Sequence, residues 1–427
     1  MIGLFLLLVF ALFAGLMFAR LLPALLAVPA MAVSVAVLAG LPFDRLLQDV
    51  VSGGALRLAP AYVAVCAGAM LSRVMMDTGI AAGIIKLAAE LGGDKPMVVA
   101  AGLMVATAVL FTSLTGLGAV IMVGTLVLPI MMSLGVPRKL AAVLFLMAFA
   151  TGFVFNIALW RLYRELLQLA PASALPPAIP RFATSLLIIS ALIVLGYTVL
   201  AARRSGEISL WSAAEPGELV DRLDDKRVPL VSLATPLVPL VLYVALGWSE
   251  LPAFLAGSLF GTLVAAPRRL GRVLSAAAVR GVEDGAPAAI LLVGIGMLLN
   301  ALTLPAVQEA LGPLMREVPI GTPLGYVAFF GLLSPLALYR GPLNPFGVGI
   351  GIYSLLFATG TLPPLALLAA IMSVVQVQNV CDPTNTHNVW VAQFTGVHVD
   401  AITRAALPTM MLVCLGGLIS GAWWFLP

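Results

Sequence analysis

Residues 112–118 read Thr-Ser-Leu-Thr-Gly-Leu-Gly, and residues 340–345 read Arg-Gly-Pro-Leu-Asn-Pro. Both stretches are polar and interrupt long apolar runs. The flanks of the first break are about 15–16 residues long, or roughly 23 Å of helix, which is short of the roughly 30 Å hydrocarbon core. Broken helix inside a bilayer must face protein or water. We therefore predict two re-entrant hairpins, at about residues 97–134 and 323–358, with these stretches as their tips.

A second pair of breaks follows the hairpins. Residues 151–156 read Thr-Gly-Phe-Val-Phe-Asn, and residues 378–387 read Gln-Asn-Val-Cys-Asp-Pro-Thr-Asn-Thr-His. They interrupt predicted helices at 139–165 and 365–392. Paired breaks in the two halves of a membrane protein indicate the binding site of a transporter.

The composition is that of an integral membrane protein. Hydrophobic residues make up 62% of the 427 residues and charged residues only 10%, whereas a soluble domain has about 25% charged residues. The net charge of +4 comes from basic residues that flank apolar segments, so it does not indicate a nucleic-acid partner. Cysteine, histidine and acidic residues show no zinc, redox or hydrolase spacing, so we expect no enzyme activity, no cofactor and no metal other than Na⁺.

The two halves correspond at a nearly constant offset. Pro60 matches Pro287 (287 − 60 = 227), and Gly135 matches Gly360 (360 − 135 = 225). This predicts one repeat at 1–200, a cytoplasmic linker at 201–228 and a second repeat at 229–427. Each repeat has five crossings and one hairpin, and an odd number of crossings inverts the second repeat. The expected fold is an all-α polytopic membrane protein with two inverted repeats, about ten transmembrane helices, two re-entrant hairpins and two broken helices.

The distribution of lysine and arginine sets the expected orientation. With the linker inside, 15 basic residues face the cytoplasm and six face outward, leaving aside Arg73 and Arg340 within the membrane. This bias follows the positive-inside rule. We therefore expect a chain in the bacterial cytoplasmic membrane with both termini outside. Among residues near the membrane boundaries, Arg73 and Asp77 are expected to pair one turn apart, and Arg161 and Arg164 to act as interface anchors.

The hairpin tips have the chemistry of an anion site. A helix that begins inside the membrane presents unpaired N–H groups and a partial positive charge. Hydroxyls, glycines and one intramembrane arginine accompany these helix ends, and an arginine fork can bind a carboxylate. The predicted substrate-binding residues are Thr112, Ser113, Thr115, Gly116, Arg340, Gly341 and Asn344.

The second break offers ligands for a coupling ion. Its carboxylate, amide and hydroxyl oxygens suit a hard cation such as Na⁺, and its carboxylate or imidazole could instead carry a proton. The first break is less polar and offers mainly Asn156. The predicted residues for the coupling ion or the substrate are Asn156, Gln378, Asn379, Asp382, Thr384, Asn385, Thr386 and His387.

The arrangement resembles the ion transporter superfamily, most of all gluconate-permease-like and citrate-transporter-like members and the large membrane subunits of TRAP transporters. The resemblance rests on the tip Ser113–Gly118, followed by Pro129, Gly135 and an alanine-rich helix, and on the segment Asn379–Trp390. The tips Ser-Leu-Thr-Gly and Gly-Pro-Leu-Asn-Pro depart from the Ser-Asn-Thr or Ser-Gly-Ser patterns of better-known branches. The resemblance implies inverted repeats, a homodimer, elevator-like movement, and symport of an organic anion with H⁺ or Na⁺.

Three functions follow from these patterns. The first is an ion-coupled transporter of a carboxylate or sugar acid. The second is a Na⁺/H⁺ antiporter that uses Asp382, although only one strong intramembrane acid is present. The third is a passive channel, or the membrane subunit of a transporter that depends on a binding protein.

Overall fold

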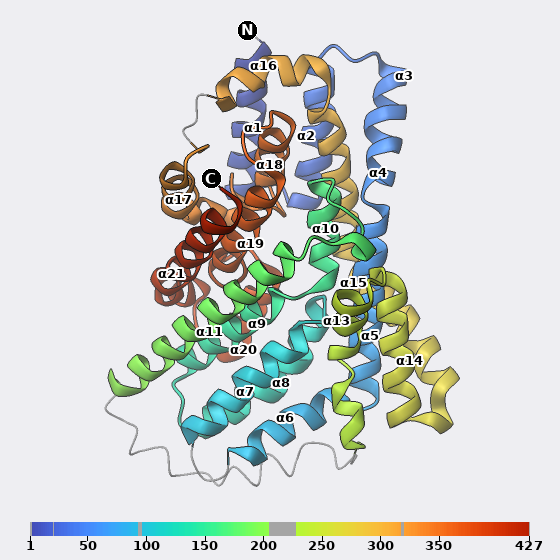
Figure 1. The fold of residues 1–427 in the computed structure, drawn as a ribbon, viewed down its shortest axis with the longest axis vertical. Helices are drawn as coiled ribbons and strands as arrows, with labels where there is room; N and C mark the ends of the chain where they lie inside the picture. Colours follow the sequence, from blue (N-terminus) through green and yellow to red (C-terminus); the bar gives the residue numbers. More distant parts are fainter. Residues whose placement is uncertain (1, 20, 93–95, 205–227, 317–319, 427) are drawn as a thin grey trace.

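The computed structural model describes residues 2–19, 21–92, 96–204, 228–316 and 320–426, and all regular structure in them is helical (Figure 1). Most of the predicted linker, residues 205–227, lies outside the described part. The first half contains α1 (Ile2–Phe18), α2 (Ala24–Leu38), α3 (Phe43–Arg45), the π-helix η1 (Leu46–Ser52), α4 (Gly53–Arg57), α5 (Ala59–Asp77), α6 (Ile80–Leu91), α7 (Pro96–Phe111), α8 (Leu117–Ser133), α9 (Arg138–Phe153), α10 (Ile157–Leu166), η2 (Ala172–Ala174) and α11 (Ala178–Arg204).

The second half repeats this order of long, short and paired helices. It contains η3 (Leu230–Ala234), α13 (Leu237–Leu246), α14 (Glu250–Ala265), η4 (Pro267–Arg269), α15 (Leu270–Leu302), α16 (Pro305–Arg316), α17 (Pro323–Leu332), η5 (Ser334–Arg340), α18 (Gly349–Ala358), α19 (Pro364–Cys381), α20 (Thr386–Thr395) and α21 (Val399–Phe425).

Five helical segments of the described chain are long and apolar enough to cross a bilayer, and the bent pair α9–α10 raises the number to as many as six. Apolar runs in the sequence predict spans at about Ala59–Met76 and Gly285–Leu304, whereas the segments Phe43–Asp77 and Pro267–Leu302 begin well before them. The sequence pattern missed their extensions because charged residues interrupt the apolar run there. Helix continues through these charges, and two of them on α15, Arg280 and Asp284, pair with Asp77 and Arg73 of α5.

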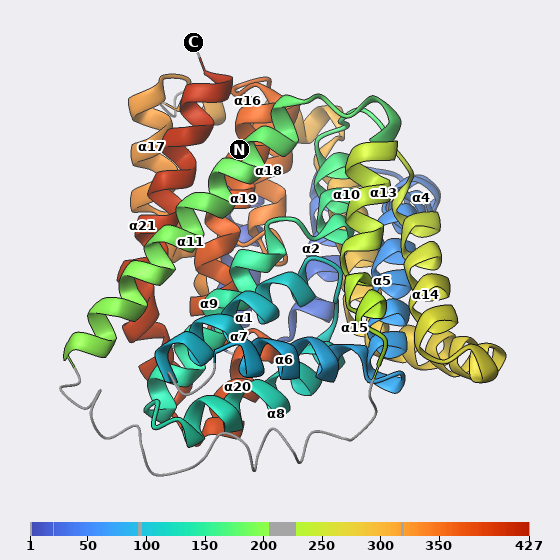
Figure 2. The ribbon, with the colours of Figure 1, turned by 60° about the horizontal axis from the view of Figure 1, so that its bottom comes forward.

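Helices α5 and α15 lie side by side and antiparallel over much of their length (Figures 1 and 2). Gly54 packs against the backbone of Met297, and Gly281 packs against the backbone of Met70. The two contacts correspond at one offset: Gly281 lies 227 positions after Gly54 (281 − 54 = 227), and Met297 lies 227 positions after Met70 (297 − 70 = 227). An antiparallel crossing whose contacts repeat at a fixed offset has local twofold symmetry.

The same offset relates two polar contacts at this crossing. Arg57 donates from Nη1 to Oδ1 of Asn300 at 2.9 Å, and Arg73 pairs with Asp284 at 2.5 Å. Arg57 corresponds to Asp284, and Asn300 corresponds to Arg73 (284 − 57 = 227; 300 − 73 = 227). The offset read from the prolines is therefore also the offset of side-chain contacts in space.

The hairpins and broken helices form the remainder of the core. In the first hairpin, α7 and α8 lie beside α6, α9 and α20 across the lower part of Figure 2. Helices α9 and α10 meet at an angle of 59°. Helix α19 is buried along almost all of its length. The broken helices thus lie inside the protein, where their freed backbone groups can find partners.

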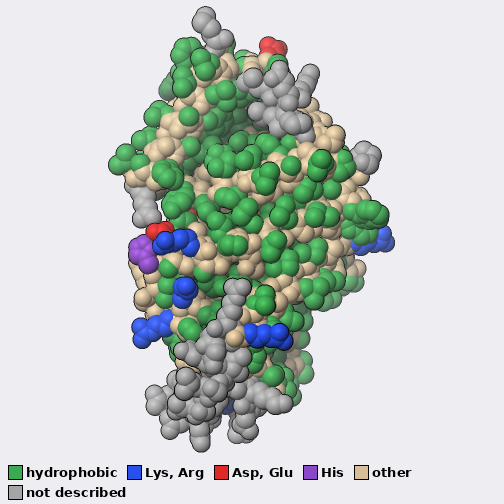
Figure 3. Space-filling view, turned by 90° about the vertical axis from the view of Figure 1, so that its left-hand side faces the viewer, with side chains coloured by type: hydrophobic (Ala, Val, Ile, Leu, Met, Phe, Trp, Pro, Cys, Tyr) green, Lys and Arg blue, Asp and Glu red, His purple; other side chains and the backbone are tan. Residues whose placement is uncertain are grey.

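The outer surface is apolar over a wide band. Figure 3 shows a face covered by hydrophobic side chains, with most of the charged ones confined to its lower part. Large apolar side chains are strongly exposed on this surface: Leu192 is 64% exposed and Leu324 is 81% exposed. Such a surface is expected where lipid replaces water as the solvent.

Candidate functional site

The tip of the first hairpin is held by Asn156, a residue in the break between α9 and α10. Helix α8 starts after Gly116, whose φ of +87° suits glycine. The fully buried Asn156 donates from Nδ2 to the carbonyl oxygens of Phe111 and Leu114, both at 3.1 Å. Its Oδ1 also accepts from the backbone N–H of Leu159, so Asn156 caps α10. One amide therefore links the tip to the break.

The predicted hydroxyl ligands of this tip donate to protein carbonyls. Thr112 donates to Val109 at 2.7 Å, Ser113 donates to Pro236, and Thr115 donates to Val65 at 3.3 Å. Their oxygen lone pairs can still accept a hydrogen bond, but their protons are used. Pro236 caps α13, the first full helix of the second half.

The tip of the second hairpin is fixed by a carboxylate. The carboxylate of Asp382 is fully buried and accepts hydrogen bonds from the backbone N–H groups of Tyr339 at 3.0 Å and Arg340 at 3.4 Å. It also accepts hydrogen bonds from Nδ2 of Asn344 at 3.0 Å and from both the backbone N–H and the hydroxyl group of Thr384. Five donors thus converge on one side chain.

This carboxylate stabilises an unusual backbone. Tyr339 and Arg340 have φ values of +55° and +57°, and left-handed conformations cost non-glycine residues of order 1–2 kcal/mol each. Asn344 completes the tip by donating to Ala337 and accepting from the N–H of Phe346. Gly341 lies so close to the carbonyl of Leu336 that a Cβ would collide with it.

The guanidinium of Arg340 has no acidic partner among the described residues. It donates from Nη1 to the carbonyl of Phe346 at 3.2 Å, while Asp382 binds its backbone instead. Two other arginines embedded between helices have acidic partners, Arg73 with Asp284 and Arg164 with Glu250, whereas Arg57 donates to the neutral amide of Asn300. The Nε and Nη2 groups of Arg340 have no acceptor among the described residues.

The second break concentrates buried amides. The helix continues further than predicted, so Gln378 and Asn379 lie on the last turn of α19, and only residues 382–385 are unwound. Gln378 and Asn385 bond to each other twice, and Nε2 of His387 donates to the carbonyl of Asn379 at 2.8 Å. Thr386 is exposed at the start of α20.

Four buried polar atoms around this break have no hydrogen-bond partner in the part of the chain that the structure describes: Gln376 Oε1, Gln378 Oε1, Asn379 Nδ2 and Asn388 Oδ1. Buried polar atoms are normally satisfied. Gln376 and Asn388 belong to the polar segment in the sequence, but the predicted site leaves them out. Their lack of protein partners marks them as candidates for contact with a ligand or water.

The first break is shorter than predicted. Thr151, Gly152 and Phe153 remain helical, and only residues 154–156 are unwound. Thr151 donates back to Met147 within the helix. Gly152 meets the backbone of Ala108 so closely that no side chain fits, which shows that its role is helix packing. The glycine in the sequence pattern therefore marked a close contact and not a break.

The two breaks have corresponding roles. Asn156 and Asp382 are separated by 226 positions (382 − 156 = 226), and each binds the hairpin tip of its own half. The halves also touch directly, since the rings of Phe149 and His387 lie 4.7 Å apart. The two broken helices thus pack against each other.

Two charge pairings differ from the sequence-based expectation. Arg73 pairs with Asp284 instead of Asp77, and Asp77 lies 3.7 Å from Arg280. Arg161 and Arg164 are not interface anchors, because both bind the buried Glu250 on α14, at 3.2 and 2.6 Å. The partners come from other helices, which counting along one helix cannot reveal.

Among the described residues, no group of three or more histidine, cysteine or acidic side chains could hold a metal ion. No protein-family model and no curated protein matches the chain. The fold is similar to a crystal structure of the Alcanivorax borkumensis YdaH transporter, which has been described as having an unusual topology. The TM-score is 0.57 at 16% identity, over 89% of this chain and 87% of that one. The fold is therefore that of a multi-pass membrane protein, and one of its structural neighbours is a transporter.

Proposed function

We propose that the chain is a secondary active transporter of a small organic anion, a carboxylate or sugar acid, coupled to H⁺ or Na⁺. The observation that carries this proposal is the guanidinium of Arg340, half-buried at a hairpin tip and without an acidic partner among the described residues. A charged arginine at membrane depth costs at least about 2.5 kcal/mol. An anionic substrate would supply the missing partner.

The buried amides around the second break support a second ligand. Three unpartnered atoms there are oxygens, on Gln376, Gln378 and Asn388. Amide oxygens are suitable ligands for Na⁺, together with freed carbonyls. Asp382 is less suited to be an alternately occupied cation site, because five protein donors already fill it. This favours the anion transporter over the Na⁺/H⁺ antiporter.

The same proposal includes the architecture that alternating access requires. Contacts that repeat at an offset of 227 across the α5–α15 crossing support two inverted repeats over the whole chain. Inverted repeats commonly exchange two related conformations. We include elevator-like movement, a homodimer and the bacterial inner membrane in the proposal.

Uptake into proteoliposomes tests the function. Labelled gluconate, citrate, succinate and lactate are offered with and without an imposed Na⁺ or pH gradient. Gradient-driven accumulation of one of them is expected. Arg340→Gln should abolish it, whereas Arg404→Gln, which changes an exposed arginine on α21, should not.

Two results together would contradict the proposal: none of the four anions is taken up, and Na⁺-driven proton movement persists in Arg340→Gln. Flux that ignores every imposed gradient would indicate a passive channel.

A further inference from the structure

An internal carboxylate lies against the first turn of α8. A Cβ on Gly118 would lie 2.7 Å from Oδ2 and 2.9 Å from Oδ1 of Asp284, and one on Gly116 would lie 3.4 Å from its carbonyl oxygen. The glycines thus let Asp284 of α15 approach the start of α8. No side chain caps this helix end.

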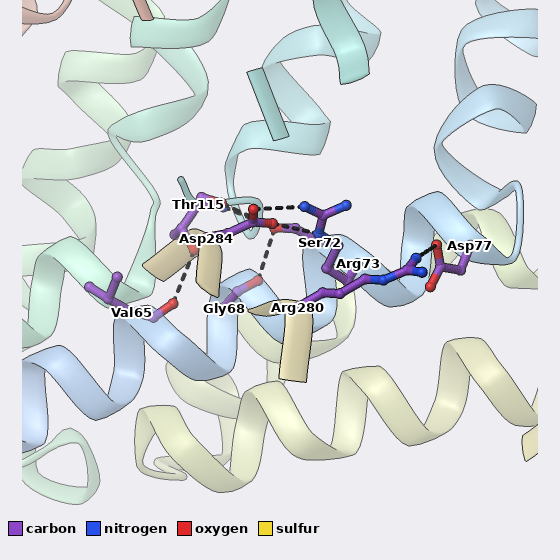
Figure 4. A network of polar contacts seen from close by, with 8 residues as sticks. All are labelled: Val65, Gly68, Ser72, Arg73, Asp77, Thr115, Arg280 and Asp284. Carbon is purple, nitrogen blue, oxygen red and sulfur yellow. Dashed lines mark hydrogen bonds and ion pairs between the residues drawn. The ribbon is translucent and has the colours of Figure 1, made fainter. Parts of the chain in front are cut away.

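Arg73 holds the same carboxylate from the opposite side. Its Nε and Nη2 donate to Oδ2 and Oδ1 of Asp284 at 2.5 and 2.7 Å, a bidentate pair (Figure 4). The side chains of Arg73 and Asp284 are 22% and 15% exposed. The pair is therefore partly exposed at the surface of the described chain.

The tip of the first hairpin contacts α5 immediately beside the Arg73–Asp284 pair. Ser72 accepts the backbone N–H of Thr115 at 3.1 Å and donates to the carbonyl of Gly68, as Figure 4 shows. Thr115 and Gly116 are among the residues predicted to bind substrate. The carboxylate of Asp284 consequently occupies the position at which a substrate carboxylate would meet the start of α8 and an arginine.

The charged and titratable groups near Asp284 are few. Helices α8 and α2 carry no charged or titratable side chain in the described sequence. Asp77 and Arg280 bind each other at 3.7 Å, and Glu283 is exposed. The charged and titratable side chains are Tyr62, Cys66, Arg73 and Asp77 on α5, and Arg272, Arg280 and Glu283 on α15 besides Asp284 itself.

We infer that Asp284 is a tethered competitor of the transported anion, and that the anion displaces it from Arg73 and the start of α8 only when Asp284 takes up a proton. The inference rests on the proposed function and specifies its coupling ion as H⁺. The proton comes from water and forms the O–H bond of the Asp284 carboxyl group. It leaves to water again when the anion departs and Asp284 rejoins Arg73.

The inference follows from charge balance. Arg73 can neutralise one carboxylate, and placing a second anion beside it would leave one negative charge unpaired in a poorly hydrated region. Protonation removes that charge. Because the anion binds the protonated form, its apparent KM should rise about tenfold per pH unit wherever Asp284 is ionised.

Asp284→Asn tests this directly in the uptake assay. It mimics the protonated side chain, so the KM should stay low and become independent of pH. Exchange of external for internal anion should persist, whereas accumulation driven by a pH gradient should be lost. Glu283→Gln, the neighbouring exposed acid, is the matched control and should keep the pH dependence of the unmodified protein.

Gly118→Ala tests the contact without changing any charge. Its methyl group would intrude on both carboxylate oxygens of Asp284 and on the position proposed for the substrate carboxylate, so the KM should rise at every pH. If Asp284→Asn does not fold, an unchanged KM in Gly118→Ala would show that the anion does not meet the start of α8 and would overturn the inference.

The outcomes separate the two proposals. Uptake whose KM depends equally on pH in Asp284→Asn and in the unmodified protein overturns the role of Asp284 and leaves the transporter intact. So does uptake driven by Na⁺ that is insensitive to pH. Absence of uptake of all four anions overturns the proposed function, and this inference with it.

Discussion

The two hairpin tips are held by side chains of opposite polarity. At tip 1, the Asn156 amide donates to two backbone carbonyls at the end of α7. At tip 2, the Asp382 carboxylate accepts two backbone N–H groups from a left-handed turn. The two side chains are separated by 226 positions, one fewer than the offset of the α5–α15 contacts, so closely corresponding positions carry the residue that the local backbone requires. A tip that presents acceptors is held by a donor, and a tip that presents donors is held by an acceptor.

The tips also differ in what surrounds them. An internal ion pair, Arg73–Asp284, lies against tip 1. Tip 2 has the guanidinium of Arg340 without an acidic partner among the described residues. Charge is therefore balanced at tip 1 by an ion pair within the protein, while the guanidinium at tip 2 donates only to a backbone carbonyl among the described residues. This difference makes tip 2 the better candidate for first contact with an anion.

Removing the acceptor at tip 2 should have the largest effect. Asp382→Ala leaves five donors without their acceptor, which costs about 3–5 kcal/mol for a buried polar network. Thermal unfolding of the detergent-solubilised protein should show a large drop in Tm or a failure to fold. Asp400→Ala, which removes an exposed carboxylate on α21, should change Tm little. Equal shifts for the two variants would mean that Asp382 does not hold the tip.

Reversing the polarity at tip 1 comes next. Asn156→Asp places carboxylate oxygens against the carbonyls of Phe111 and Leu114, and the loss of stability should exceed the roughly 1–3 kcal/mol of an unsatisfied buried group. Asn156→Ala, which removes the donor without adding charge, should cost less. The two variants are compared by the same unfolding measurement. If the Asp variant were the more stable, the donor role of Asn156 would be wrong.

The sequence could predict where helices break, because breaks are marked by local composition, whereas the predicted count of about ten transmembrane helices compares with five or up to six helical segments of the described chain that are long and apolar enough to span. Thr112–Gly118 and Arg340–Pro345 break apolar runs, and both tips lie where helix ends in the structure. The broken helices also begin and end within a few residues of the predicted limits. Hydropathy and breaker residues are properties of short stretches, so a single sequence reveals them.

The partners of charged residues could not be predicted in the same way. Arg73 has an acid four positions away, yet it binds Asp284, 211 positions along the chain. Likewise, Arg164 binds Glu250, which lies 86 positions further along the chain on α14. These pairs depend on how helices cross. The offset of 227 contained part of this information, because in a duplicated antiparallel crossing a contact between residues 57 and 300 implies an equivalent contact between residues 73 and 284.

The duplicated crossing itself can be tested at two glycines. Gly54→Ala and Gly281→Ala each introduce a methyl group against the backbone of the partner helix, and each should cost about 1–3 kcal/mol. The two losses should be similar, because the contacts are related by the local twofold. Gly271→Ala on α15, which has open space around it, is the control and should not destabilise. A loss at only one of the two sites would break the equivalence.

The smallest effect on stability is expected at Thr115, where it separates structure from function. Thr115→Val removes a hydroxyl whose bond to Val65 is long, at 3.3 Å, so the unfolding free energy should fall by at most about 1 kcal/mol. Thr125→Val removes a comparable hydroxyl from the exposed side of α8, where it donates to Met122, and serves as the control. If the oxygen of Thr115 accepts a hydrogen bond from a bound anion or its hydroxyl groups, the KM for uptake should rise in Thr115→Val and stay unchanged in Thr125→Val. Equal KM values with equal stability would assign Thr115 only to the docking of tip 1, and would leave tip 2 as the principal anion site.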